Sequence, residues 1–199
     1  MTEYYYSQNP EVASDQQQFT FDLLGHTLKF TTDNGVFSKR TVDYGSRVLI
    51  GTIPAQVLVA GPLLDLGCGY GPIGLSLAAQ FPERQIVLSD VNERALALAQ
   101  KNAQDNQLTN VQVVESAGYA KLNQQFAGIW TNPPIRAGKE VVNDMLTAAK
   151  AHLLPGGQLF AVLQKKQGAP SAKKLMQATF GNCEIIQRDK GYYILRSQN

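Results

Sequence analysis

The sequence predicts an α/β fold, a mostly parallel β-sheet with helices on both faces, from three observations. Short apolar runs alternate with helical patterns from residue 61 to the C-terminus, which is the order that strand-helix-strand units produce. A glycine-rich turn joins one of these apolar runs directly to a helical pattern, as expected where a ligand site lies at the strand ends of such a sheet. The length of 199 residues suits a single domain.

The elements follow in order. In residues 1–60, apolar stretches at 19–23 and 27–31 flank Gly25 and His26, which predicts a hairpin within a small N-terminal β cap. Residues 61–199 are the expected core of the single domain 1–199. Its expected strands are 63–66, 86–88, 111–114, 128–130, 158–163, 184–187 and 192–195. Its expected helices are 72–80, 93–104, 140–152 and 172–180. The short 189–191 turn predicts an antiparallel closing hairpin.

Composition excludes several classes of protein. The chain is 44% hydrophobic and 17% charged, and it has no run near the roughly 18 apolar residues of a membrane-spanning helix. The N-terminus lacks the pattern of a secretory signal, and two cysteines cannot form a disulfide framework. His26 and His152 are isolated and predict no metal site. We therefore expect a cytoplasmic protein, associated with no membrane.

Charge is distributed unevenly along the chain. From Arg136 onward there are ten Lys or Arg against four acidic residues, whereas the preceding part has eight against twelve. A basic C-terminal third could contact nucleic acid. Charge alone favours the alternative, a solvated lysine-rich face, and leaves the nucleic-acid interpretation open.

The glycine-rich turn predicts a ligand site. Gly67, Gly69 and Gly71 follow the strand at 63–66, and Pro72 suits the first position of the next helix. Glycine permits a tight turn and a close approach of ligand to backbone. Because Gly74 completes a G-x-G-x-x-G pattern with Gly69 and Gly71, a dinucleotide is one candidate ligand.

Two carboxylates favour a different ligand. Asp65 stands at the tip of the strand before the turn, where it would repel a pyrophosphate but help to hold a cationic ammonium group, directly or through water. This favours S-adenosylmethionine as the cofactor. Asp90 ends the next strand and could accept hydrogen bonds from the ribose hydroxyls, or it could be an acid at a helix N-terminus.

A second turn, Asn132-Pro133-Pro134, ends the strand at 128–130. The two prolines restrict the backbone, so that the Pro133 carbonyl and the Asn132 side-chain oxygen can serve as two fixed acceptors. Two such acceptors suit a planar amino group, because holding its hydrogens directs the nitrogen lone pair toward an electrophilic methyl group. These three residues are the predicted catalytic group.

With these motifs the sequence resembles the class I S-adenosylmethionine-dependent methyltransferases, in particular the small-domain group of ribosomal small-subunit RNA guanine-N2 methyltransferases. The resemblance covers nearly the whole chain. Besides the glycine-rich turn, it rests on the segments Tyr5-Tyr6-Ser7-Gln8-Asn9-Pro10, 32–39, 42–45, 90–92 and 132–139.

The resemblance implies a Rossmann-like, seven-stranded sheet with an antiparallel last strand. It places Phe37 and residues 43–45 beside the adenosine and Asn132 at the target amine. The expected cofactor-binding residues are Phe37, Asp65, Gly67, Gly69, Gly71, Asp90, Val91, Ala117 and Asn132. The expected substrate-binding residues are Ile135, Arg136 and Lys139, and the expected partner is ribosomal RNA or the small ribosomal subunit.

This chain departs from the family's pattern at two positions. Ala117 stands where many relatives have Asp or Asn to contact the adenine amine, and Ile135 where many amine methyltransferases have an aromatic residue. The extra N-terminal half of some relatives is also expected to be absent. Cys68 is expected to be a packing residue of the turn and not a nucleophile.

Several functions compete. A ribosomal RNA guanine-N2 methyltransferase is the first, and methylation of a protein glutamine amide or of adenine N6 uses the same kind of Asn-Pro-Pro turn. A binding module that has lost catalysis and a nicotinamide-dependent oxidoreductase are candidates from other classes.

Overall fold

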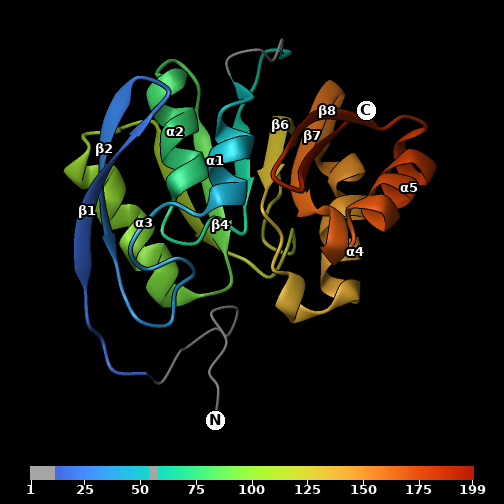
Figure 1. Cartoon of the computed structure of the whole chain (residues 1–199). Helices are drawn as coiled ribbons and strands as arrows, with labels where there is room; N and C mark the ends of the chain where they lie inside the picture. Colours follow the sequence, from blue (N-terminus) through green and yellow to red (C-terminus); the bar gives the residue numbers. More distant parts are fainter. Residues whose placement is uncertain (1–11, 54–57) are drawn as a thin grey trace.

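The computed structural model describes residues 12–53 and 58–199 (Figure 1). The segment Tyr5 to Pro10, which contributed to the family resemblance, lies outside the described residues. The described part contains a two-stranded sheet and a seven-stranded sheet. This confirms the predicted α/β fold and the small N-terminal β hairpin.

The large sheet has the strand order β5-β4-β3-β6-β7-β9-β8. Its first five strands are parallel, and β9 runs antiparallel to both β7 and β8. The predicted strands are all present, with ends that differ by a few residues. Their bounds are β3 Leu63–Leu66, β4 Ile86–Asp90, β5 Val111–Glu115, β6 Phe126–Thr131, β7 Leu153–Gln164, β8 Glu184–Asp189 and β9 Tyr192–Gln198.

Helices cover both faces of this sheet. The α-helices are α1 Tyr44–Ile50, α2 Pro72–Gln80, α3 Glu93–Asp105, α4 Lys139–Thr147 and α5 Ala169–Phe180. Short 3-10 turns, η2 Ile135–Ala137, η3 Ala148–His152 and η4 Lys165–Gln167, join them to their neighbours. In the described residues, no helix combines the length and the apolar character needed to cross a membrane.

Helix α1 was not predicted from the sequence. It has only 7 residues and begins at an N-cap, Asp43, whose side chain accepts a hydrogen bond from the Ser46 amide. Its buried face consists of Val48, Leu49 and Ile50, which pack in one of the two core clusters. Tertiary packing therefore stabilises a helix too short to be stable alone.

The hairpin of β1 Gln17–Leu23 and β2 His26–Thr32 lies beside α3 (Figure 1). Two asparagines attach it there. The buried Asn102 accepts from the Thr31 amide at 2.7 Å and donates to the Thr31 carbonyl at 3.0 Å. One helical turn later, Asn106 makes the same pair of bonds with the backbone of Lys29. The two amides thus bind backbone groups of Lys29 and Thr31 that a hairpin edge would otherwise leave to water.

The core is divided by the sheet into two apolar clusters. One cluster joins the sheet to α1, α2, α3 and the hairpin, and the other joins it to α4 and α5. Gly74 lets α2 pack closely on β4, because a Cβ at Gly74 would stand 2.5 Å from the Leu88 side chain.

The strand order reverses at β3. From β3 the chain continues to β4 on one side, whereas β6 pairs with β3 on the other. Ligands bind at such a reversal of strand order, outside the carboxyl ends of the strands.

Candidate active site

A cavity of about 590 Å³ opens at the carboxyl ends of the parallel strands. Pockets of this size hold small ligands such as nucleosides. The lining residues come from the ends of β3, β4, β5 and β6 and from segments that follow or face them, and include Gly67, Gly69, Asp90, Ala117 and Asn132. The cavity therefore lies at the reversal of strand order, where the predicted site residues converge.

The glycine-rich turn forms the floor of one part of this cavity. The amides of Gly67 and Cys68 both donate to the Ser89 carbonyl, at 2.8 and 3.0 Å. Gly67, Gly69 and Gly71 have positive φ values of 75, 57 and 99°, a conformation that glycine adopts without the penalty of a Cβ. The turn is thus fixed against β4 in the form that the glycine spacing predicts.

Asp90 is the most strongly tied acid of the cavity lining. One carboxylate oxygen accepts from the Gly69 amide and the other from the Asn92 amide, each at 2.9 Å. Burial raises the pKa of Asp90 above its ordinary value, although these backbone hydrogen bonds act in the opposite direction. Each oxygen keeps further lone pairs that can accept hydroxyl groups from a ligand in the cavity.

Asp65 lies in a different place from the one expected. It has no exposed surface and is not among the residues lining the cavity. One oxygen accepts from the Gly74 amide at 2.7 Å, so the side chain turns back beneath the turn toward α2. The other oxygen has no hydrogen-bond partner among the described residues. Burial, assisted by the charge of Asp90, raises the pKa of Asp65 to about 7.

Asn132 contributes an amide to the cavity from the end of β6. Its amide nitrogen donates to a carboxylate oxygen of Asp43 and to the Ser46 hydroxyl, each at 3.0 Å. Since these bonds use both hydrogens of the nitrogen, the side-chain oxygen is the group left to accept hydrogen bonds.

The residues after Asn132 divide between the cavity and the core. Pro134 lines the cavity, whereas Pro133 is buried and does not. Ile135 is partly buried against the apolar cluster beneath α4, and it does not line the cavity either. Arg136 and Lys139 are exposed close to lining residues of α4.

The segment 32–39 covers one side of the cavity through Val36 and Phe37. Phe37 is 42% exposed, and its ring lies where the cavity opens to solvent. The Gly35 carbonyl accepts from the side-chain nitrogen of Asn92 at 3.1 Å, which ties the segment to the N-terminus of α3.

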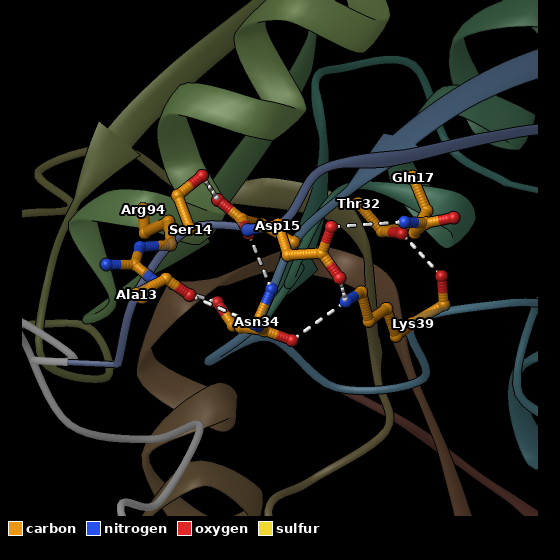
Figure 2. A network of polar contacts seen from close by, with 9 residues as sticks. Ala13, Ser14, Asp15, Gln17, Thr32, Asn34, Lys39 and Arg94 are labelled. Carbon is orange, nitrogen blue, oxygen red and sulfur yellow. Dashed lines mark hydrogen bonds and ion pairs between the residues drawn. The ribbon is translucent and has the colours of Figure 1, made fainter.

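A polar network holds the same segment in place (Figure 2). Lys39 donates to Asp15 at 2.6 Å and to the side-chain oxygen of Asn34 at 2.8 Å, and Arg94 donates to the Asn34 carbonyl at 2.9 Å.

Asp33 belongs to the same network. It is buried and accepts hydrogen bonds at 2.6 to 2.7 Å from Ser14 and from the amides of Asp15 and Asn34. Burial acts to raise the pKa of Asp33, but these bonds outweigh it and the pKa is lowered. These bonds therefore hold in place the segment that carries Phe37.

Helix α4 supplies lining residues that the sequence analysis did not identify. Glu140, Val141, Asp144 and Met145 share the face of α4 that is turned to the cavity. Glu140 and Asp144 are four residues apart, as are Val141 and Met145, and this spacing is typical of residues on one face of a helix. Sequence alone does not show that this face approaches the glycine-rich turn, where the Met145 methyl group lies 3.4 Å from the position of a Cβ on Gly67.

The charges around the cavity discriminate between ligands. Its described lining contains three acids, Asp90, Glu140 and Asp144, and no Lys, Arg or His. A pyrophosphate would meet carboxylates without a compensating cation, whereas a cationic sulfonium or ammonium group is attracted by them. The residues present therefore fit S-adenosylmethionine and disfavour a dinucleotide.

Two other predictions concern side chains that take no part in this chemistry. Cys68 is buried, and burial together with the charges of Asp90 and Asp65 raises the pKa of its thiol well above the ordinary value. A protonated thiol is a poor nucleophile. Over the described ranges, no group of three or more His, Cys, Asp or Glu side chains is arranged to hold a metal ion.

Comparison with known proteins gives consistent matches. The family model of the methyltransferase small domain matches residues 27–196. The uncharacterized protein YbxB of Bacillus subtilis (strain 168) is 48% identical over 200 residues, which is 100% of this chain and 99% of YbxB. The ribosomal RNA small subunit methyltransferase C of Photorhabdus laumondii is 32% identical over 83% of this chain and 53% of its own length.

A solved structure provides the matching fold. The T. thermophilus 16S rRNA N2 G1207 methyltransferase RsmC, in complex with AdoMet and guanosine, superposes with a TM-score of 0.82 at 26% identity. The match covers 95% of this chain and 52% of that one. The chain thus spans about half the length of these named ribosomal RNA methyltransferases, whereas it spans nearly all of YbxB.

Proposed function

The chain belongs to the methyltransferase small domain family, and we propose that it transfers a methyl group from S-adenosylmethionine to the exocyclic N2 amine of a guanine in small-subunit ribosomal RNA. The observation that carries this proposal is the amide of Asn132. Its nitrogen is bound by Asp43 and Ser46, and its oxygen is available at an acid-lined cavity that suits a cationic cofactor.

The cofactor is held by residues from both sides of the cavity. Asp90 would accept hydrogen bonds from the ribose hydroxyls, and Phe37, Val91 and Ala117, which line the same cavity, would flank the adenosine. Gly67 and Gly69 provide close access to the backbone. Asp65 makes no direct contact with the cofactor in this proposal; it supports the turn from beneath by accepting a hydrogen bond from the Gly74 amide at the start of α2. When bound, S-adenosylmethionine supplies an electrophilic methyl group on a positively charged sulfur.

The protein's part in the reaction is to orient the target amine. An aromatic amine is a weak nucleophile because its lone pair is delocalised into the ring. The Asn132 oxygen accepts a hydrogen bond from the amine, which turns the lone pair toward the methyl group and stabilises the positive charge that develops on nitrogen. The Pro133 carbonyl is the proposed acceptor for the second N–H group, although Pro133 is buried and does not line the cavity. Reaching the amine requires the guanine to leave its base stack.

Relatives of this chain support the choice of substrate. The matched relatives from Photorhabdus laumondii and other bacteria are ribosomal RNA small subunit methyltransferases, and the T. thermophilus structure contains guanosine. Arg136 and Lys139 lie exposed beside the cavity and would contact the RNA near the target base. The partner is then ribosomal RNA or the small ribosomal subunit, and the site of action is the cytoplasm.

A protein glutamine amide is the alternative substrate, since the same two acceptors would orient its nitrogen, and adenine N6 is another. Ile135 is aliphatic, packs against the core and does not line the cavity, so it provides no aromatic ring on which a base would stack. This observation keeps the non-aromatic amide as a candidate for the test.

The test is to incubate the purified chain with tritiated S-adenosylmethionine and one of three acceptors: undermodified small ribosomal subunits, their naked RNA, or protein extract. Mass spectrometry of digested products then distinguishes N2-methylguanosine, N6-methyladenosine and methylated glutamine. We expect N2-methylguanosine. Label only in protein would overturn the RNA assignment.

Asn132→Ala is the matched inactive variant. We expect it to lower single-turnover methyl transfer by about 100- to 1,000-fold, the usual cost of losing one preorganised partner of a developing charge. Its affinity for S-adenosylmethionine should stay near normal. If Asn132 is only scaffolding, the rate per folded, cofactor-loaded molecule will instead equal that of the unaltered protein.

A further inference from the structure

We propose that Asp43 and Ser46 are positioning residues for methyl transfer, which fix the orientation of the Asn132 amide so that its oxygen faces the cavity. The inference rests on the proposed function, because it gives the pair a role only if Asn132 accepts a hydrogen bond from the target amine. Neither residue is assigned a contact with the reacting atoms.

The hydrogen bonds define one orientation of the amide. The torsion that turns the end of an asparagine side chain is broad and nearly two-fold, so a rotation of about 180° exchanges oxygen and nitrogen with little effect on shape. The Ser46 hydroxyl can accept or donate, and so it tolerates both orientations. The Asp43 carboxylate only accepts, and it receives the Asn132 nitrogen at 3.0 Å. Asp43 is therefore the residue that distinguishes the two orientations.

The rotated amide would be unproductive. It would face the Asp43 carboxylate with its own oxygen and present N–H groups to the cavity. A donor cannot hold the hydrogens of an amine, so the lone pair would no longer be directed. In the observed orientation, the negative charge of Asp43 also polarises the Asn132 amide through the hydrogen bond and makes its oxygen a stronger acceptor.

The structure holds Asp43 and Ser46 rigidly relative to β6. The Asp43 oxygen that binds Asn132 also accepts from the Ser46 amide at 3.1 Å, which makes Asp43 the N-cap of α1. Gly45, which lies between Asp43 and Ser46 in the sequence, packs closely on Tyr192 of β9, because a Cβ at Gly45 would stand 2.8 Å from the Tyr192 ring. The Tyr192 hydroxyl accepts from Gln164 at the end of β7 at 2.6 Å. The first turn of α1 thus packs against β9, whose neighbour β7 pairs with β6, the strand that Asn132 follows.

The experiment is a double-mutant cycle between Asp43→Ser and Asn132→Ala. Serine is as good an N-cap as aspartate, so Asp43→Ser preserves the start of α1 while it removes the carboxylate from Asn132. We expect single-turnover transfer at saturating S-adenosylmethionine to fall by about 10- to 150-fold in Asp43→Ser, the range for loss of a hydrogen bond to a charged group. In the Asn132→Ala background the same change should have no further effect, because its partner is already gone.

A second measurement does not depend on activity. In ¹⁵N-labelled protein without ligand, the side-chain amide hydrogens of Asn132, identified by their absence in Asn132→Ala, should be protected from exchange with water. Asp43→Ser should remove this protection while the fold stays intact. Exchange that is unchanged in Asp43→Ser would overturn the inference.

Asn110→Ala is the control for loss of stability alone. Asn110 directly precedes β5, at the amino ends of the parallel strands and so at the end of the sheet opposite the cavity. Its side chain donates to the carbonyls of Ala78, Phe81 and Arg84. We expect this variant to unfold at lower temperature with an unchanged rate per folded molecule. A rate in Asp43→Ser equal to that of the unaltered protein, with Asn132→Ala slow, would refute the positioning role and leave the proposed function intact. An Asn132→Ala rate equal to the unaltered one would instead refute the proposed mechanism.

Discussion

At the scale of single residues, the Asp90 carboxylate both fixes the glycine-rich turn and faces the cavity. Its oxygens hold the amides of Gly69 and Asn92, so removal of the side chain loosens the turn as well as any ligand contact. We expect Asp90→Ala to raise the dissociation constant for S-adenosylmethionine by about 10- to 150-fold, the equivalent of a charged hydrogen bond of roughly 1.5 to 3 kcal/mol.

Isothermal titration calorimetry of the folded variant measures this change. Asp105→Ala is the control, because Asp105 is paired with Lys101 on the surface of α3 and does not line the cavity. If Asp90→Ala binds S-adenosylmethionine with unaltered affinity, Asp90 is not a cofactor ligand and acts only as an acid near the N-terminus of α3.

Asp65 predicts a pH dependence of folding stability. Its pKa rises from the ordinary 3.8 to about 7 in the folded protein, chiefly through burial. Between these two values the folded protein binds more protons than the unfolded chain, so the contribution of neutral Asp65 is complete below about pH 4 and is lost as the pH rises through about 7.

Urea unfolding of the unaltered protein and of Asp65→Asn, from pH 4 to 8, measures this contribution. The free energy of unfolding of the unaltered protein should fall relative to that of Asp65→Asn as the pH rises. Parallel curves would show that Asp65 is ionised throughout in the folded state.

The site residues that could be predicted from the sequence are those in short continuous motifs. Gly67, Gly69, Asp90 and Asn132 each belong to a turn whose residue types and spacing already indicate its conformation, and they meet at one cavity. The partners of Asn132 come from a segment 86 or more residues away, and a local pattern carries no information about such a contact. The place of Asp65 has a different cause: its partner, the Gly74 amide, lies within the same motif, but the glycine spacing does not show whether the carboxylate turns toward the ligand or toward α2.

At the scale of elements, η4 and the first turns of α5 carry the lysines of the basic C-terminal third. Lys165, Lys166 and Lys174 are exposed and Lys173 is partly exposed, and η4 directly follows the end of β7 beside β6. We expect reversal of these four charges to weaken RNA binding and to flatten its salt dependence. Each phosphate that the protein no longer neutralises should remove about one released counterion from the slope.

Filter binding at several salt concentrations measures both effects, and calorimetry should show unchanged affinity for S-adenosylmethionine. Reversal of Lys29, exposed on the hairpin strand β2, is the matched control. A salt slope equal to that of the unaltered protein would identify the four lysines as an ordinary solvated face.

Helices α1 and α4 show why elements differ in how well a sequence predicts them. A helix was expected at 140–152, and α4 with η3 occupies nearly this range, because the apolar spacing extends over several turns. Helix α1 is only 7 residues long, too short for a periodic pattern, and only its N-cap and apolar end mark it. Asn102 in α3 and Asn106 at its C-cap appear in the sequence only as polar positions, yet they attach the hairpin.

At the scale of the whole molecule, the cavity connects parts of the chain that belong to separate core clusters. Its lining includes Phe37 from the segment after β2 and Val141 from α4, and these elements pack on opposite faces of the sheet. A ligand that contacts both sides stabilises the folded state as a whole, because the unfolded chain offers no such cavity.

We therefore expect S-adenosylmethionine at 100 times its dissociation constant to stabilise the protein by about 2.7 kcal/mol. For a chain of this size, that corresponds to a rise in melting temperature of roughly 5 to 11 °C. Differential scanning fluorimetry or calorimetry measures it. NAD at the same concentration should cause no rise, since its pyrophosphate would face Asp90, Glu140 and Asp144 without a basic residue in the described lining. A rise with NAD and none with S-adenosylmethionine would contradict the interpretation of the cavity as a site for a cationic ligand.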